Sequence, residues 1–283
     1  MTYRALEKAI TRWATAEPNV QALVLIGSQA RKDHPADTWS DLDLMLLVTN
    51  QNAYVDDSSW FDTFGEVWLR VLNFTGAGDP EWMILYAGGL KVDFILVSAT
   101  GSLSDTLNDF IYAKAVQRGV RILLDKKGDI VLVSNPTNVN QVWVRPSPVE
   151  FAALLHQFWL SIYRASNMLQ RGELWRARTI TDGHVRQQLL RMLEWHARAK
   201  KGRAVDTWYQ GRFLTDWVEP HWLAQLPQIF ALYSSDATRH AIIASMTLMD
   251  NLGRETADIW HYPYPLKNQT QIQEWIKVSL SGV

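Results

Sequence analysis

The sequence predicts an α+β protein in which a mixed α/β N-terminal domain over residues 1–138 precedes an all-helical C-terminal domain over residues 139–283. The length supports two domains, because 283 residues are about twice the ~150 residues of an average domain. Short apolar runs, which are typical of buried strands, dominate the first half of the chain. Beyond residue 150 the apolar residues recur at helical spacing, which predicts a helical second half.

The composition excludes several classes of protein. The chain has no cysteine, which excludes a disulfide scaffold, a thiolate metal site and a cysteine nucleophile. The N-terminal residues are charged and amphipathic and contain no apolar stretch of signal-peptide length. The aliphatic run Leu44–Val48 is far too short to cross a membrane. We therefore expect a soluble, cytoplasmic protein with no membrane partner.

The charges divide unevenly along the chain. Residues 1–140 carry 17 acidic and 12 basic residues, whereas residues 141–283 carry 12 acidic and 16 basic residues. This asymmetry indicates two regions with different tasks. The net charge of −1 and the absence of a recognisable RNA- or DNA-binding motif argue against a nucleic-acid partner.

The elements of the first domain follow from apolar spacing. A helical repeat of Leu6, Ile10 and Trp13 predicts a helix over residues 3–15. The run from Ala22 to Ile26 predicts a buried strand. Further strands are expected at 41–48, 66–72, 82–86, 90–97 and 130–133, with a hairpin turn at Gly88-Gly89 and a helix over 102–120.

A change in amino-acid composition marks the predicted domain boundary. Residues 134–148 are rich in Pro, Asn and Ser, which is typical of a linker. Beyond it, one apolar stripe runs from Phe151 to Leu169 and predicts a helix, with Phe158 in its core. A second stripe over 185–196, closed by Gly202, and a third over 241–252 predict two more helices.

Two carboxylates sit at the start of a predicted strand. Because strand side chains alternate between faces, Asp41 and Asp43 point the same way, while the leucines between and beyond them point into a core. Two carboxylates this close repel each other unless a cation lies between them. Magnesium prefers oxygen ligands and leaves positions open for substrate phosphates. We expect Asp41 and Asp43 to hold Mg²⁺.

A third carboxylate lies within a later apolar strand. Asp93 has apolar neighbours on both sides, and an acid in that setting is costly unless it is paired or bound to metal. If its strand lies beside the first, Asp93 completes a site for two Mg²⁺ ions that promote in-line displacement at phosphorus.

The turn after the first strand supplies a candidate phosphate site. Gly27 allows close approach of a phosphate, and Ser28 adds a hydroxyl beside free N–H groups at the start of a helical turn. Arg31 and Lys32 follow and are expected to add positive charge. Arg145, which precedes Pro146 near the domain boundary, is a further candidate to bind the nucleotide phosphates.

The combined pattern resembles the nucleotidyltransferase superfamily that includes DNA polymerase β. That superfamily shares a hydrophobic-Gly-Ser turn, a strand with Asp-x-Asp and a later strand with one more Asp, matched here by Gly27-Ser28, Asp41, Asp43 and Asp93. Within it, the chain resembles the streptomycin (aminoglycoside) 6-adenylyltransferase family. The similar stretches lie between residues 23 and 202 and include LIGSQARKD, SDLDLMLLVTN, KVDFILV, VWVRPSP and VRQQLLRMLEWHARAKKG.

The resemblance implies a catalytic domain with a mixed β-sheet flanked by helices, and a helical substrate-binding domain. It implies Mg²⁺-dependent transfer of AMP from ATP to a hydroxyl group, with release of pyrophosphate. Asp41 and Asp43 match the metal-binding pair, and Ser28 matches the phosphate-binding serine. Asp93 matches the third acid, which is either a metal ligand or the base for the attacking hydroxyl.

The sequence of the helical domain does not decide which molecule accepts the AMP group. The resemblance implies an aminoglycoside such as streptomycin, whose cations should meet carboxylates. Residues 171–203, however, hold nine basic and three acidic residues, and the acids available to meet a cation there and nearby are Glu150, Glu173, Asp182 and Glu194. An acidic lining would favour an aminoglycoside, whereas a basic or apolar lining would favour a lincosamide, another metabolite or a protein hydroxyl. A nucleotide-binding protein without activity is the alternative of a different class.

Overall fold

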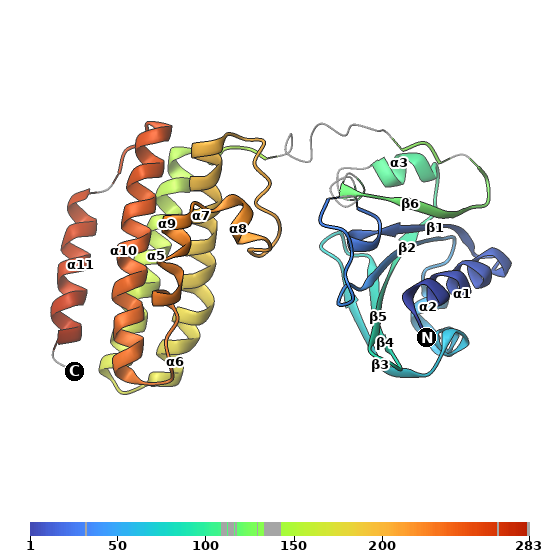
Figure 1. The fold of residues 1–283 in the computed structure, drawn as a ribbon, viewed down its shortest axis with the longest axis horizontal. Helices are drawn as coiled ribbons and strands as arrows, with labels where there is room; N and C mark the ends of the chain where they lie inside the picture. Colours follow the sequence, from blue (N-terminus) through green and yellow to red (C-terminus); the bar gives the residue numbers. More distant parts are fainter. Residues whose placement is uncertain are drawn as a thin grey trace. The chain divides into compact units, whose positions relative to one another are not determined.

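The computed structural model describes residues 1–31, 33–108, 112, 116, 118–128, 130–132, 143–264 and 266–281. The chain divides into two compact units, Met1–Val139 and Asn140–Val283. Residues 133–142, which make up much of the expected boundary segment, lie outside the described residues. Figure 1 shows a unit built around a sheet and a unit built of helices, and each is described here by itself.

A six-stranded mixed sheet forms the centre of the first unit. Its strands lie in the order β3-β4-β5-β2-β1-β6, and all neighbours are antiparallel except β2 and β5, which are parallel. The strands are β1 (Val20–Ile26), β2 (Leu42–Val48), β3 (Val67–Phe74), β4 (Pro80–Tyr86), β5 (Leu90–Ser98) and β6 (Arg121–Asp125). The expected strands at 22–26, 41–48, 66–72, 82–86 and 90–97 are therefore confirmed to within a few residues, and Ala87–Gly89 turn the chain between β4 and β5.

Apolar side chains from both faces of the sheet are buried. On one face, Leu44 and Leu46 of β2 pack with Leu6 and Ile10 of α1 (Tyr3–Ala16) and with residues of α2 (Asn52–Asp56) and the 3₁₀ turn η2 (Ser59–Phe64). On the other, alternate strand residues pack against α3 (Leu103–Asn108). Because both faces of β2 are covered, side-chain packing fixes its position in the sheet in addition to its backbone hydrogen bonds.

The prediction of a strand at 130–133 was wrong. Residues 130–132 form no strand, and the sheet instead gains β6, which pairs antiparallel with β1. The reason is a turn after β6, where the Asp125 carboxylate accepts hydrogen bonds from the backbone N–H groups of Lys127, Gly128 and Ile130. The backbone N–H of Ile130 is thereby bonded to a side chain and not to a neighbouring strand. The expected helix over 102–120 begins as α3, and residues 109–111 and 113–115 lie outside the described part.

The second unit is helical, as expected. Its long helices are α5 (Pro148–Gln170), α7 (Arg186–Lys201), α10 (Ser235–Trp260) and α11 (Leu266–Ser281), joined by shorter turns α6 (Leu174–Thr179), η3 (Ile180–Val185), α8 (Leu214–Trp217), α9 (Pro220–Leu223) and η4 (Leu226–Ile229). Ser147 and Glu150 form a reciprocal capping box that starts α5. The predicted stripe from Phe151 to Leu169 faces the core, and Gly202 ends α7. Among the described residues, no helix is both long and apolar enough to cross a membrane.

Candidate active site

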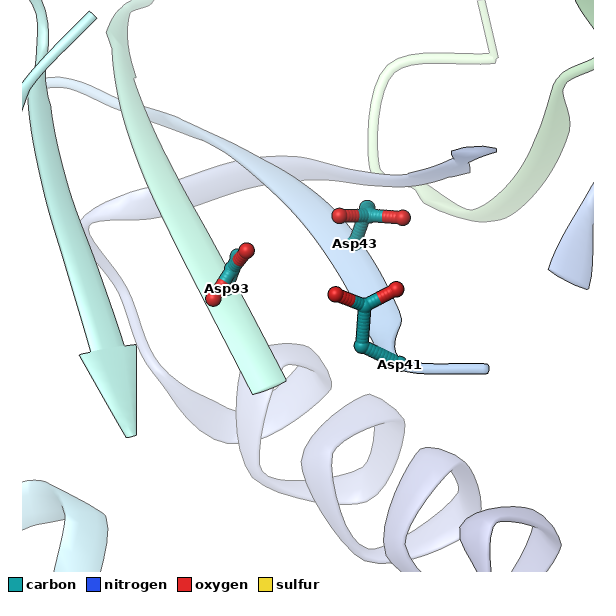
Figure 2. Close-up of side chains that lie close together, drawn as sticks. All are labelled: Asp41, Asp43 and Asp93. Atoms are coloured by element: carbon teal, nitrogen blue, oxygen red, sulfur yellow. The ribbon is translucent and has the colours of Figure 1, made fainter. Parts of the chain in front are cut away.

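The three predicted carboxylates come together at one end of the sheet. Asp43 lies on β2, Asp41 immediately precedes that strand, and Asp93 lies on β5 (Figure 2). One oxygen from each of the three carboxylates lies within 4.8 Å of the others. The sequence analysis expected this juxtaposition only if the two strands were neighbours, and they are.

Strand register explains why the carboxylates meet. The parallel pairing of β2 with β5 aligns Asp43 with Asp93, and it aligns Leu42 with Val92 on the preceding rung. Side chains on alternate residues share a face, so Asp41, Asp43 and Asp93 all project from the same side of two adjacent strands. A shift of one residue would turn one strand's acid into the opposite core.

The Gly-Ser turn lies against this acidic cluster. β1 ends at Ile26, which pairs with Asp43, so the following 3₁₀ turn η1 (Gly27–Gln29) begins beside the Asp43 carboxylate. A Cβ on Gly27 would lie 1.9 Å from Asp43 Oδ2. Ser28 is buried, and its Oγ has no hydrogen-bond partner among the described residues. Such an unpaired buried hydroxyl is available to a ligand.

Lys91 is a site residue that the sequence analysis missed. Its Nζ lies 3.0 Å from Asp41 Oδ2 and 2.6 Å from Asp93 Oδ2, so one ammonium bridges two of the three carboxylates. Lys91 precedes Asp93 by two residues and therefore shares its face of β5. The motif Lys-x-Asp carries this signal, because residues two apart in a strand share a face.

The electrostatics of the cluster are those of crowded like charges. Burial, together with the neighbouring Asp41 and Asp93 charges, raises the pKa of Asp43 to about 7. Burial also raises the pKa of Asp93, although Lys91 opposes the rise. Burial lowers the pKa of Lys91, but its ion pairs with Asp93 and Asp41 outweigh that effect and raise it overall.

The donor set fits a hard divalent cation. Three carboxylates offer only oxygen, which is the ligand type that Mg²⁺ prefers. Asp93 Oδ1 is buried and has no hydrogen-bond partner among the described residues. An unpaired buried carboxylate oxygen is costly, and a cation would satisfy it. Burial and the neighbouring acids also raise the pKa of Asp43, and a bound cation would oppose that rise.

A fourth acid, Glu81, faces the cluster from β4. The pairing of β4 with β5 aligns Met83 with Asp93, so Glu81, two residues earlier, is on the same face. Burial and the Asp93 charge raise the pKa of Glu81. The sequence analysis did not single out Glu81, because Pro80 and Glu81 precede the apolar residues that indicated the strand.

The predicted phosphate-binding arginines are held locally. Arg31 Nε donates to the His34 carbonyl oxygen at 2.7 Å. Arg145 belongs to the helical unit, where it donates to the Trp260 carbonyl oxygen and stacks on the rings of Trp260 and Tyr262. Lys32 lies outside the described residues. A phosphate-binding role for Arg31 and Arg145 stays a prediction.

The four acids named as candidates to meet a cationic acceptor already have partners within the helical unit. Glu150 accepts from Ser147 in the capping box. Glu173 pairs with Arg171 and Arg176, and Asp182 pairs with Arg178 and Arg186. Glu194 lies 3.5 Å from Arg191. The basic residues of segment 171–203 thus neutralise the three acids among them.

The first long helix of the helical unit borders a largely apolar pocket of about 320 Å³. His156 and Trp159 of α5 line it together with residues of α11. Phe158 is fully buried in the core, as expected. His156 is exposed at the pocket.

Comparison with known proteins identifies relatives along nearly the whole chain. A family model described as streptomycin adenylyltransferase matches residues 2–278. An aminoglycoside 6-adenylyltransferase of Campylobacter jejuni is 24% identical over 270 residues, covering 92% of this chain and 90% of that protein. One of Bacillus subtilis (strain 168) is 22% identical over 261 residues, covering 89% of each. The crystal structure of an aminoglycoside 6-adenyltransferase from Bacillus subtilis aligns with a TM-score of 0.45 at 19% identity, covering 98% of this chain and 97% of that one.

Proposed function

The chain belongs to the streptomycin adenylyltransferase family, whose members are nucleotidyltransferase enzymes, and we propose that it transfers AMP from ATP to a hydroxyl group of an aminoglycoside such as streptomycin in a Mg²⁺-dependent reaction that releases pyrophosphate. We also propose that it acts in the cytoplasm, where ATP is available.

One observation carries the proposed chemistry. Register pairs Asp43 with Asp93 on parallel neighbouring strands, with Asp41 beside them and the Gly27-Ser28 turn against Asp43. The carboxylates proposed to bind metal and the turn proposed to bind phosphate therefore lie at the same end of the sheet. Nucleotidyl transfer needs this combination, because the transferred phosphoryl group must be both bound and neutralised.

The residues of this chain would divide the work as follows. Asp41 and Asp43 would hold Mg²⁺, which when bound neutralises phosphate charge and orients the phosphoryl group for in-line attack. Ser28 Oγ, which has no hydrogen-bond partner among the described residues, would donate to a phosphate oxygen. Asp93 would act either as a further ligand or as the base that accepts the proton of the acceptor hydroxyl, and its raised pKa suits the second role.

The pairing of the helical acids supports a second candidate acceptor. Because Glu173, Asp182 and Glu194 are each paired with arginine, they offer a polycation less than free carboxylates would. A hydroxyl acceptor with little positive charge, such as a lincosamide, another metabolite or a protein side chain, is therefore the alternative. Glu81, beside the acidic cluster, is the carboxylate on the sheet that we expect to meet a cationic acceptor.

The test is pyrophosphate release from MgATP by the full chain with streptomycin, with a lincosamide and without an acceptor. Streptomycin-dependent release, with the acceptor gaining the mass of one AMP residue, is expected. Release with another acceptor only would keep the chemistry and replace the substrate. Tight MgATP binding with no turnover on any acceptor would favour the non-catalytic nucleotide-binding alternative.

A further inference from the structure

Lys91 lies where the acidic cluster most needs positive charge. Its ammonium contacts Asp93 Oδ2 at 2.6 Å and Asp41 Oδ2 at 3.0 Å. One positive charge among three carboxylates leaves the cluster short of balance even with Lys91 in place. Asp43 has no cationic partner among the described contacts, and its pKa is the one raised to about 7.

The carboxylates that Lys91 joins are also ones that a divalent ion would use, because Asp41, Asp43 and Asp93 offer oxygens within 4.8 Å of one another. Asp41 and Asp93 stand on different strands, and a cation that joined them would lie close to the Lys91 ammonium, which already contacts one oxygen of each. Mg²⁺ takes its oxygen ligands at about 2.0–2.1 Å. A divalent ion and an ammonium bound to the same two carboxylates would repel each other strongly at such close range.

We propose that Lys91 is a built-in substitute for the metal, which holds Asp41 and Asp93 together while no ion is bound and leaves them when a divalent ion binds. This inference rests on the proposed function, because it assumes that the three carboxylates form the metal site. Lys91 is then a positioning residue that sets how tightly the site binds metal.

The side chain of Lys91 suits such an exchange. Its ammonium sits on a flexible four-carbon stem, and its side chain is 41% exposed, against 12% for Asp93. The ammonium can therefore swing toward solvent without unpacking the sheet, whereas the carboxylates are fixed by the register of β2 and β5. The carboxylates are preorganised in both states, and only the cation between them changes.

The experiment is a titration of the full chain with Mn²⁺ and with Mg²⁺ by calorimetry, without nucleotide. The Lys91→Met variant keeps the apolar stem and removes the competing charge, so we expect it to bind metal about tenfold or more tightly than wild type. Lys91→Arg keeps the charge and should restore an affinity near that of wild type. Lys8→Met removes an exposed lysine on α1 and is the matched control for loss of charge.

Thermal unfolding supplies a second readout. Without metal, Lys91→Met should melt below wild type, because three carboxylates then face one another unbalanced. Saturating Mn²⁺ should raise its melting temperature by more than it raises that of wild type. A variant that folds only when metal is present would support the proposal in its strongest form.

The outcomes separate this inference from the proposed function. If wild type binds metal and Lys91→Met binds it equally or more weakly, the substitute role is overturned while the metal site stands. If Lys91→Met does not fold at any metal concentration, Lys91 is a requirement of the fold and the inference is also overturned. If neither protein binds metal, both the inference and the metal site fail.

Discussion

Gly27 and Asp43 lie so close together that a Cβ on Gly27 would stand 1.9 Å from Asp43 Oδ2. The antiparallel pairing of β1 and β2 causes this, because it aligns Ile26 with Asp43 and brings the next residue against the carboxylate. Gly27 also has a φ of +71°, which residues with a Cβ rarely adopt. The absence of a side chain at Gly27 lets the Asp43 carboxylate lie directly against the turn.

We predict that Gly27→Ala abolishes metal binding at the acidic cluster. The added methyl group must displace the Asp43 carboxylate, in addition to the roughly 1–2 kcal/mol of strain from a left-handed backbone conformation. Gly128→Ala is the matched control, because Gly128 has a φ of +68° and open space around its Cβ position. Mn²⁺ titration and thermal unfolding of both variants check this. Equal metal affinity in the two would show that the contact with Asp43 does not matter.

The Ser28→Ala variant should bind nucleotide more weakly than wild type without losing thermal stability. Ser28 Oγ is buried without a partner among the described residues, so its removal should leave the melting temperature unchanged or raise it. Loss of a hydrogen bond to a charged phosphate should nevertheless weaken nucleotide binding by about 1–3 kcal/mol. Calorimetric titration with MgATP in the absence of acceptor measures the loss.

The control for this variant is Ser166→Ala in the helical unit, where Ser166 Oγ donates to the Ile162 carbonyl oxygen. That variant should lose a little stability and no nucleotide affinity. If Ser28→Ala binds MgATP as wild type does, Ser28 has no place in the phosphate site.

Asp43→Asn should make the metal-free protein more stable and the enzyme inactive. The folded-state pKa of Asp43 is raised to about 7, so its ionisation costs the folded state stability as pH rises from about 4 towards 7. Removing the charge should therefore stabilise the protein at pH 8 in a chelator, by up to about 4 kcal/mol given ~1.4 kcal/mol per pKa unit. Pyrophosphate release should fall to background, because the metal loses a ligand.

Asp56→Asn, the same change at an exposed site on α2, is its control and should alter neither property. An Asp43→Asn enzyme with wild-type turnover would remove Asp43 from the metal site, whatever its stability.

The acidic site could be predicted from the sequence because its parts obey short-range rules. Alternation of side chains along a strand places Asp41 with Asp43, and the apolar neighbours of Asp93 mark it as an acid that needs a partner. The pairing of Asp43 with Asp93 depends on which strands are neighbours. That depends on the packing of both faces of the sheet, and the residues near each acid do not encode it locally.

The features that the sequence did not predict, β6 and Lys91, likewise depend on contacts between residues that are distant in the chain. The strand β6 is half exposed, and charged residues bound its apolar run of Ile122, Leu123 and Leu124, which is shorter than the runs that identified β1 and β2. Its place at the edge of the sheet comes from pairing with β1. The Lys-x-Asp motif places Lys91 on the same face as Asp93, but its second partner, Asp41, lies fifty residues away and cannot be inferred from the neighbouring residues. The ion pairs of Asp182 with Arg178 and Arg186, by contrast, follow helical spacing and were open to prediction.

His196 is a buried titratable group in the helical unit, remote in sequence from the acidic cluster. Its Nε2 lies 2.9 Å from Glu255 Oε2 and its Nδ1 lies 3.8 Å from Glu219 Oε2, while Lys200 lies on the other oxygen of Glu255 at 2.5 Å. Its ring meets the edge of the Trp222 ring. Burial lowers the pKa of His196, and the two glutamates only partly oppose that effect.

This arrangement predicts that the protein loses stability below about pH 6.5, the unperturbed pKa of histidine. A lowered folded-state pKa means that the unfolded chain binds the proton more readily, so the stability is complete above the unfolded value and declines as pH falls through it. His196→Gln keeps a hydrogen-bond donor and cannot titrate, so its melting temperature should fall less than that of wild type between pH 7 and about pH 5. His240→Gln, at an exposed histidine of α10, is the control and should follow wild type. Parallel curves for wild type and His196→Gln would show that His196 is as easily protonated in the folded protein as in the unfolded chain.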